Sequence, residues 1–239
     1  MSASQSEPEQ TGIIKHDDFK SHESPDLTLE TFWYIKRVDP RTDEKTTIKH
    51  TLKLLVNKKA LNSLPAYDKR KPTAVEVTLS PRWSGSSKTS FTLDDRNDHG
   101  IAWKLMLSIF TPTESTALTP EVLASPDINL EIFWHLAVVC DKWNVDAKDE
   151  RVAATFRAWY AVHKMEEAIN SPSKLLFAQS LLWPAWYFDH AKAFQWATRY
   201  VIYNDAGHIE PWNPTKYRNI IIPKRITRKY LIIGDHLTC

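Results

Sequence analysis

The sequence predicts an α+β protein, with a small N-terminal β-sheet followed by a cluster of α-helices. Segments before Asp98 are rich in β-branched and aromatic residues or alternate apolar with polar ones, as strands do. Segments after Asp98 repeat apolar residues every three or four positions, as amphipathic helices do. Hydrophobic residues make up 42% of the 239 residues, which is enough for a sizeable core.

The predicted sheet follows a polar segment. Residues 1–24 carry five acidic and two basic side chains, and we expect a disordered acidic tail there. The composition of Leu27–Val38 is typical of a strand, residues 39–45 are typical of a turn, and residues 46–56 are expected to return as the second strand. Three shorter elements complete this half: a helix over residues 57–64 and strands over residues 75–79 and 89–93.

The predicted helices are recognised by their capping residues and apolar stripes. Asp98, Asn129, Asp146 and Asp189 are expected to cap four of them, and Ser171 followed by Pro172 opens another that Pro184 should kink or break. Residues 111–126 are expected to form a long loop. The expected helices cover residues 101–110, 130–143, 147–163, 172–188 and 191–204, and a basic helix follows at about residues 223–231.

Composition excludes several classes of function. The chain has only 5 glycines, and no dinucleotide-binding, phosphate-binding or hydrolase-elbow glycine pattern occurs. The net charge of +2 is too small to indicate a general nucleic-acid or membrane binder. No apolar run is long enough to span a membrane, and no signal peptide precedes the sheet, so we expect an intracellular protein of the cytoplasm, the nucleus or both.

Three phrases between Ser90 and Tyr203 resemble the fungal BTB/POZ-domain proteins. The first is FTLDDRND at residues 91–98 with WKLMLSIF at residues 103–110, similar to the family's strand, acidic turn and leucine-paired helix. The others are NLEIFWHLAVVCDKWNV at residues 129–145, and LLWPAWYFD at residues 181–189 followed by FQWATR. Trp143 and Val145 replace the family's usual Tyr and Cys, and the family's first strand–helix phrase has only partial counterparts here.

The resemblance implies a protein-interaction module, often self-associating, with no chemistry of its own. It divides the chain into the tail, a BTB/POZ-like domain over residues 25–163, and a C-terminal helical extension over residues 164–239. The expected function is that of a non-enzymatic adaptor or scaffold, with protein partners that include a second copy. The alternatives are a nucleic-acid-associated protein that uses the basic C-terminal helix, and an enzyme with an unrecognised site.

The residues that could carry chemistry have plainer structural explanations. Asp94, Asp95 and Asp98 lack the spacing of a cation-binding loop and suit a strand-to-helix turn. His163 falls on an apolar stripe, and Cys140 sits in an apolar helical pattern, as core residues do. The nine histidines show no paired spacing for zinc. We therefore expect no catalytic, cofactor or metal site.

Two surfaces remain as candidates for binding. Leu27–Val38 is expected to present an apolar strand edge to a partner through Phe32, Trp33, Tyr34 and Ile35. The basic C-terminal run is expected to contact an anion or an acidic partner through Lys224, Arg225, Arg228 and Lys229. A further aromatic series, from Trp183 to Trp212, is expected to belong mainly to the core.

Overall fold

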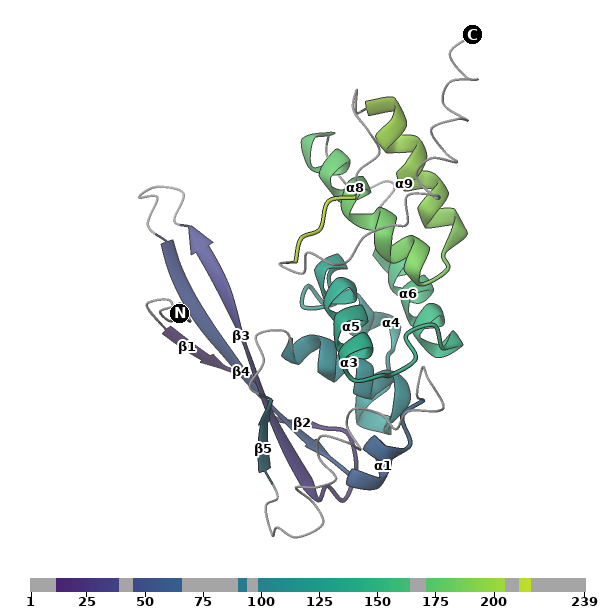
Figure 1. Cartoon of the computed structure of the whole chain (residues 1–239). Helices are drawn as coiled ribbons and strands as arrows, with labels where there is room; N and C mark the ends of the chain where they lie inside the picture. Colours follow the sequence, from purple (N-terminus) through teal and green to yellow (C-terminus); the bar gives the residue numbers. More distant parts are fainter. Residues whose placement is uncertain are drawn as a thin grey trace, which may run out of the picture. The chain divides into compact units, whose positions relative to one another are not determined.

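The computed structural model describes residues 12–38, 45–65, 90–93, 99–163, 171–204 and 211–215. These residues form an α+β fold, in which a five-stranded mixed sheet is followed by helices, as the sequence predicts (Figure 1). The chain forms two compact units: residues 1–117 with 138–145, and residues 118–137 with 146–239. The expected boundary between residues 163 and 164 falls inside the second unit.

A long antiparallel hairpin forms the centre of the sheet in the first unit. β3 (Leu27–Val38) pairs with β4 (Lys45–Val56), from Leu27 opposite Val56 to Val38 opposite Lys45. Both strands agree with the prediction to within one residue. The predicted turn between them lies outside the described residues.

Short strands flank this hairpin, in the order β1-β4-β3-β5. β1 (Gly12–Lys15) and β2 (Phe19–Lys20) run parallel to β4, and β5 (Ser90–Leu93) runs parallel to the first part of β3. The prediction of a disordered tail is therefore wrong for residues 12–24. The free edge of β4 offers backbone groups to this segment, which bonds to them and buries Phe19.

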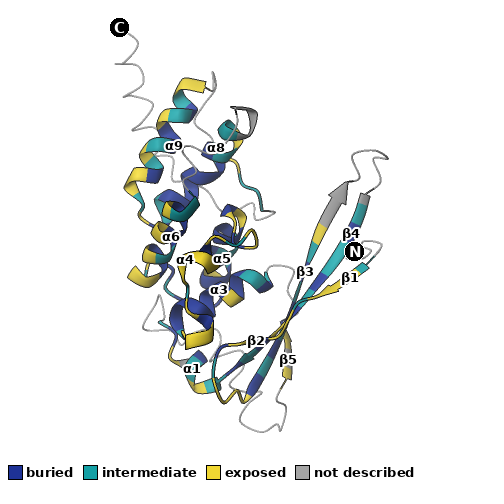
Figure 2. Ribbon diagram, turned by 180° about the vertical axis from the view of Figure 1, so that it is seen from behind, coloured by how far each residue is buried: buried dark blue, intermediate teal, exposed yellow. Residues whose placement is uncertain are grey.

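Alternation along the strands gives the sheet one buried face and one more exposed face. On the buried face lie Leu29, Thr31 and Trp33 of β3, together with Leu52, Leu54 and Val56 of β4. On the other face, Phe32 and Tyr34 are half-buried and Lys53 is exposed. Figure 2 shows this mixture of burial along both long strands.

Two helices of the first unit accompany the sheet. α1 (Lys58–Asn62) follows β4 and is capped by Asn57, whose side-chain oxygen accepts hydrogen bonds from two backbone amides. α3 (Gly100–Phe110) packs on β3 and β4 and is buried on nearly all sides. His99 occupies its N-cap position without a side-chain cap. Asp98, the cap that the sequence predicts, lies outside the described residues.

The expected loop over residues 111–126 contains two short helices. A 3₁₀ turn, η1 (Glu114–Thr116), closes with the reciprocal capping hydrogen bonds of Thr113 and Thr116. The helix α4 (Pro120–Leu123) begins with proline at its first position, and the side chain of Thr119 accepts a hydrogen bond from Val122. The high Thr, Ser and Pro content that indicates a loop also supplies these caps.

Four longer helices follow: α5 (Leu130–Lys142), α6 (Glu150–His163), α8 (Ser171–Tyr187) and α9 (Ala191–Asn204). Asn129 caps α5 as predicted, through Ile132. The other two predicted caps are displaced. Asp149, rather than Asp146, bonds the first amides of α6, and His190, rather than Asp189, caps α9 through Ala193.

An aromatic core holds the second unit together. Phe133 contacts Phe156 and Trp159 with ring centroids 5.0 Å apart, and Phe156 contacts Phe188 at 5.2 Å. All four side chains are fully buried. The helices α8 and α9 run side by side (Figure 1), with the small residues Ala193 and Ala197 buried on α9.

Candidate functional site

The predicted interface segment divides between the two faces of the sheet. Trp33 is only 5% exposed and belongs to the buried face, so it cannot act as an open anchor for a partner. Ile35 is 38% exposed, and Phe32 and Tyr34 are half-buried on the opposite face. The sequence prediction places the four residues on one surface, whereas the two-residue period of a strand separates Trp33 from its neighbours.

Three histidines gather around Trp33. The rings of His16, His50 and His99 lie 5.0, 5.2 and 4.8 Å from the Trp33 ring. His16 Nε2 and His50 Nδ1 are 2.9 Å apart, so one ring donates a hydrogen bond to the other. The cluster fixes the end of β1 against β4, where the His16 amide also donates to the Thr51 carbonyl.

Sequence spacing cannot reveal this cluster, because its members come from four separate segments. Only the register of β1 on β4 and the position of α3 bring them together. Within the described ranges, no group of three His, Cys, Asp or Glu side chains is arranged to hold a metal ion. The ring contacts with Trp33 make the cluster part of the packing of the first unit.

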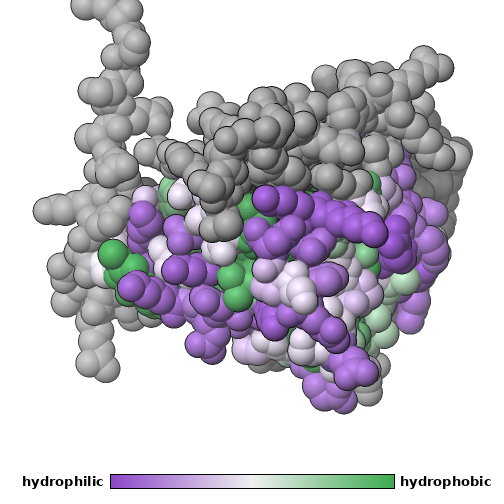
Figure 3. All heavy atoms as spheres, turned by 90° about the horizontal axis from the view of Figure 1, so that it is seen from below, coloured by the Kyte–Doolittle hydropathy of each residue, from purple (hydrophilic) through white to green (hydrophobic). Residues whose placement is uncertain are grey.

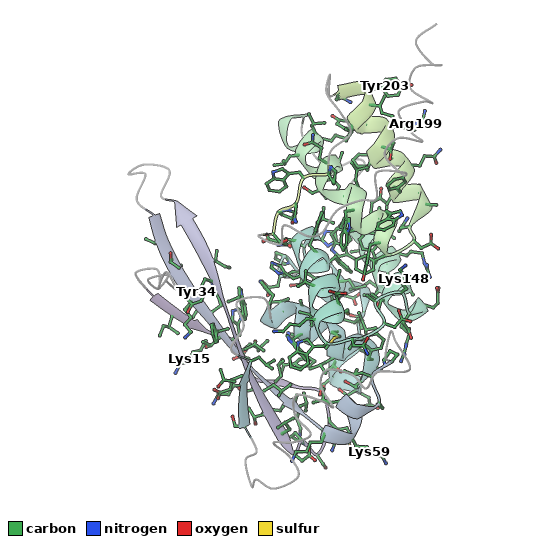
Figure 4. All side chains as sticks on the ribbon, viewed as in Figure 1. Lys15, Tyr34, Lys59, Lys148, Arg199 and Tyr203 are labelled. Carbon is green, nitrogen blue, oxygen red and sulfur yellow. The ribbon has the colours of Figure 1, made fainter. Side chains whose placement is uncertain are left out.

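The more exposed face of the sheet carries a compact group of five residues, which we call the sheet patch: Ile13, Lys15, Phe32, Tyr34 and Lys49. Strand register places Ile13, Lys49 and Tyr34 in one row across β1, β4 and β3. The next row on this face holds Lys15 and Phe32, with Thr51 between them. Lys15 and Tyr34 are labelled on their strands in Figure 4.

Aromatic and cationic groups are in contact within the sheet patch, in the same rows as an exposed aliphatic side chain. The Phe32 and Tyr34 rings meet edge to face at 5.9 Å, and Lys49 Nζ lies 4.5 Å from the centroid of the Phe32 ring. Ile13 is 60% exposed and Lys15 is exposed beside it. This combination of half-exposed aromatic rings with exposed aliphatic surface is typical of protein interfaces.

Among the described strands, the outer edge of β1 beside the sheet patch has no partner. Since the His16 amide bonds to β4, alternation directs the backbone groups of Ile13 and Lys15 away from β4. Among the residues that the structure describes, no strand pairs with this outer edge of β1. Natural sheets cover or charge such edges, or use them for binding.

The predicted aromatic series of the helices contributes mainly to packing. Trp183 is buried, stacks on Trp134 at 4.7 Å and contacts Tyr187 at 4.5 Å. Tyr203 and Trp212 are the exposed members, at 68% and 46%. Trp212 lines a shallow groove of about 290 Å³ in the second unit together with Asn129, Leu130, Glu131, Leu176, Phe177, Ser180 and Pro214.

The other predicted features have separate outcomes. Lys224, Arg225, Arg228 and Lys229 lie outside the described residues, as do Asp94 and Asp95. His163 Nε2 lies 3.0 Å from the Leu123 carbonyl, and Cys140 is fully buried, so both have the packing roles that the sequence predicts. None of the helices described is both long and apolar enough to cross a membrane.

Two carboxylates outside the sheet patch have a lowered pKa. Hydrogen bonds from the Arg151 side chain hold the pKa of Asp149 below its usual value. A hydrogen bond with the Thr119 side chain is the main cause of a lowered pKa at Glu121. Both carboxylates lie at or near helix N-termini, where a helix favours negative charge.

Among the described residues, exposed apolar side chains outside the sheet patch are mostly separate, although Leu176 and Trp212 line the same groove. The surface shown in Figure 3 is mainly hydrophilic, with hydrophobic residues as small separate groups among the described atoms. Isolated residues of this kind need no partner.

The comparisons with known proteins found no relative: no protein-family model, no curated protein and no solved structure matches the chain.

Proposed function

We propose that this chain is a non-enzymatic protein-interaction module, an adaptor or scaffold that binds a partner protein through the sheet patch. The observation that carries the proposal is the contact of Phe32, Tyr34 and Lys49 beside the exposed Ile13, next to an edge of β1 that no strand of the described residues pairs with. Aromatic residues that are already packed together lose little conformational freedom on binding.

The resemblance to the BTB/POZ proteins supports the same kind of function. The order of β5 and α3 along the chain is compatible with the family's strand and following helix. The proposal does not depend on membership of that family, because the sheet patch is defined by its own contacts. The proposed function is compatible with a second copy of the chain as partner and with a different protein.

Photo-crosslinking in cells tests the proposal. A photoreactive phenylalanine analogue at Tyr34 should yield a covalent adduct with a partner, and mass spectrometry should identify it. Tyr203 on α9 is the matched control, because it is an exposed tyrosine of the other unit (Figure 4). Adducts of equal yield from both positions, or none from Tyr34, would contradict the proposed function.

A further inference from the structure

We infer that the partner segment recognised by the sheet patch is acidic and carries apolar or aromatic side chains between its carboxylates. This inference rests on the proposed function and adds the chemistry of the partner. It follows from the charges on this face of the sheet, from the arrangement of its apolar groups, and from what a second copy would place there.

Most of the charged strand residues described on this face of the sheet are lysines. Lys15, Lys20, Lys49 and Lys53 face the same side, while Glu30 is the acidic strand residue described there. Glu30 already pairs with Lys53 at 3.6 Å. Lys15 and Lys49 therefore remain as the cations of the sheet patch, and a partner that supplies carboxylates would complement them.

Apolar groups lie beside these two lysines. In the first row across β1, β4 and β3, Lys49 lies between Ile13 and Tyr34. In the second row, Lys15 on β1 and Phe32 on β3 lie on either side of Thr51. A partner whose carboxylates approach the lysines brings its intervening side chains onto the aromatic rings and the isoleucine. Glutamate and aspartate alone would leave this apolar area uncovered.

The surroundings restrict where the partner's carboxylates can lie. Asp17 and Asp18 are exposed in the segment directly after β1. Carboxylates placed near them would be repelled, so those of the partner should face Lys15 and Lys49 rather than the start of β2.

A second copy is a poorer occupant than an acidic segment. Two copies that meet through the same patch about a two-fold axis would bring Lys15 and Lys49 of both chains into one interface, and the patch has no carboxylate to offset these four positive charges. Like charges in direct opposition across strands are destabilising. The acidic partner is therefore the occupant to which the inference commits.

The test uses a labelled random copolymer of glutamate and tyrosine as probe, with the full chain and fluorescence anisotropy as readout. A copolymer of lysine and tyrosine is the opposite-charge probe. The two variants to compare are Lys15→Glu with Lys49→Glu, and the control Lys59→Glu with Lys148→Glu. Lys15, Lys59 and Lys148 are exposed and Lys49 is half-buried. The control pair, labelled in Figure 4, lies outside the sheet patch.

We expect the acidic probe to bind and the patch variant to bind about tenfold more weakly, with the control variant within about twofold of the original chain. Added salt should weaken the original interaction. Unchanged binding of the patch variant, or equal binding of both copolymers, would overturn the inference. The basic C-terminal residues cannot mimic the expected result, because both variants keep them.

The outcome is separable from the proposed function. Specific crosslinking at Tyr34 together with unchanged binding by the patch variant would leave the function standing and remove the acidic partner. Failure of crosslinking at Tyr34 removes the function itself. Melting curves of both charge variants show whether each remains folded, and Lys15→Gln with Lys49→Gln gives a neutral version of the same test.

Discussion

At the scale of single residues, Gly100 determines how closely α3 approaches the sheet. A β-carbon at this position would lie 2.4 Å from both Thr31 Oγ1 and a ring carbon of Trp33. These distances are far below normal contact, and the neighbours are buried. Glycine is needed here because a larger residue would not fit, and not because of a turn or a phosphate site. No sequence motif therefore identifies this position.

Replacing Gly100 by alanine should destabilise the protein by about 1–3 kcal/mol, because the buried neighbours must shift. Alanine is the better helix former, so intrinsic propensity would favour the opposite sign. Chemical denaturation measures the change. Gly12→Ala is the control, since a β-carbon there would have no atom within 4 Å, and it should alter stability by less than about 0.5 kcal/mol. A neutral Gly100→Ala would contradict this packing.

Replacing Asp149 by asparagine should cost about 0.2–1 kcal/mol at pH 7, because the amide can still cap α6 but loses the ion pair with Arg151. The pKa of Asp149 is lowered in the folded chain, so its stabilisation is present at neutral pH and is lost as pH falls below about 4. Urea unfolding at pH 7 and pH 3 should show the difference between the two proteins shrinking. A pH-independent difference would contradict the assignment.

At the scale of elements, α8 continues through Pro184, where the sequence predicts a kink or break. Proline has no amide hydrogen to donate to the Ser180 carbonyl four residues earlier. The Trp134 indole N–H donates to that carbonyl at 3.0 Å. A side chain of α5 thus satisfies the group that the proline leaves without its helical donor.

Trp134→Phe should destabilise the protein by about 1–3 kcal/mol, because it leaves the buried Ser180 carbonyl without this donor. In a Pro184→Ala background the alanine amide can bond that carbonyl, and the same substitution should then cost less. A double-mutant cycle by chemical denaturation measures the coupling. Costs that are equal in both backgrounds would show that the indole hydrogen bond does not compensate for the proline.

The elements that the sequence predicts well are those with long internal patterns. β3, β4 and the long helices each carry enough apolar repeats to identify them. β1 and β2 have 4 and 2 residues, which are too few to show the alternating pattern of a strand. They form strands because their backbones pair with the edge of β4. Predicted and observed caps differ by one to three residues because several Asp, Asn and His side chains compete near each helix start.

The helix ends show the same dependence on backbone context. Asn144 and Asp189 have φ angles of 52° and 53°, and each follows the last turn of a helix. Glycine is the usual residue there, but asparagine and aspartate also tolerate this conformation. Neither of these two helix ends has a glycine that would mark it in the sequence. Because Asp189 comes just before a helical pattern, the sequence predicts it as the N-cap of the next helix instead.

At the scale of the whole molecule, residues 12–20 are part of the sheet. β1 and β2 complete one side of β4, and Phe19 is buried. The candidate site is predictable in part, because strand composition points to Phe32 and Tyr34, although it also points to Trp33 and Ile35 on the opposite face. Ile13, Lys15 and Lys49 join this face only through strand register, which no local pattern specifies.

Truncation tests the structural role of the N-terminal segment. Deleting residues 1–11 should change the free energy of unfolding by less than about 0.5 kcal/mol, since that segment is polar. Deleting residues 1–20 should cost at least about 2 kcal/mol, because it removes Phe19 from the core and the His16 contacts with His50. Equal stability of the two truncated chains, measured by chemical denaturation, would contradict a structural role for β1 and β2.

The affinity of the chain for the partner identified by crosslinking at Tyr34 tests the central claim most directly. Isothermal titration calorimetry should compare the original chain with a Phe32→Ala, Tyr34→Ala variant and with Tyr203→Ala as the control, after melting curves establish that each is folded. Loss of both rings of the sheet patch should weaken binding at least about tenfold, as the removal of interface aromatics does, while the control keeps its affinity. An unchanged affinity in the folded double variant would contradict the claim that this chain binds its partner through the sheet patch.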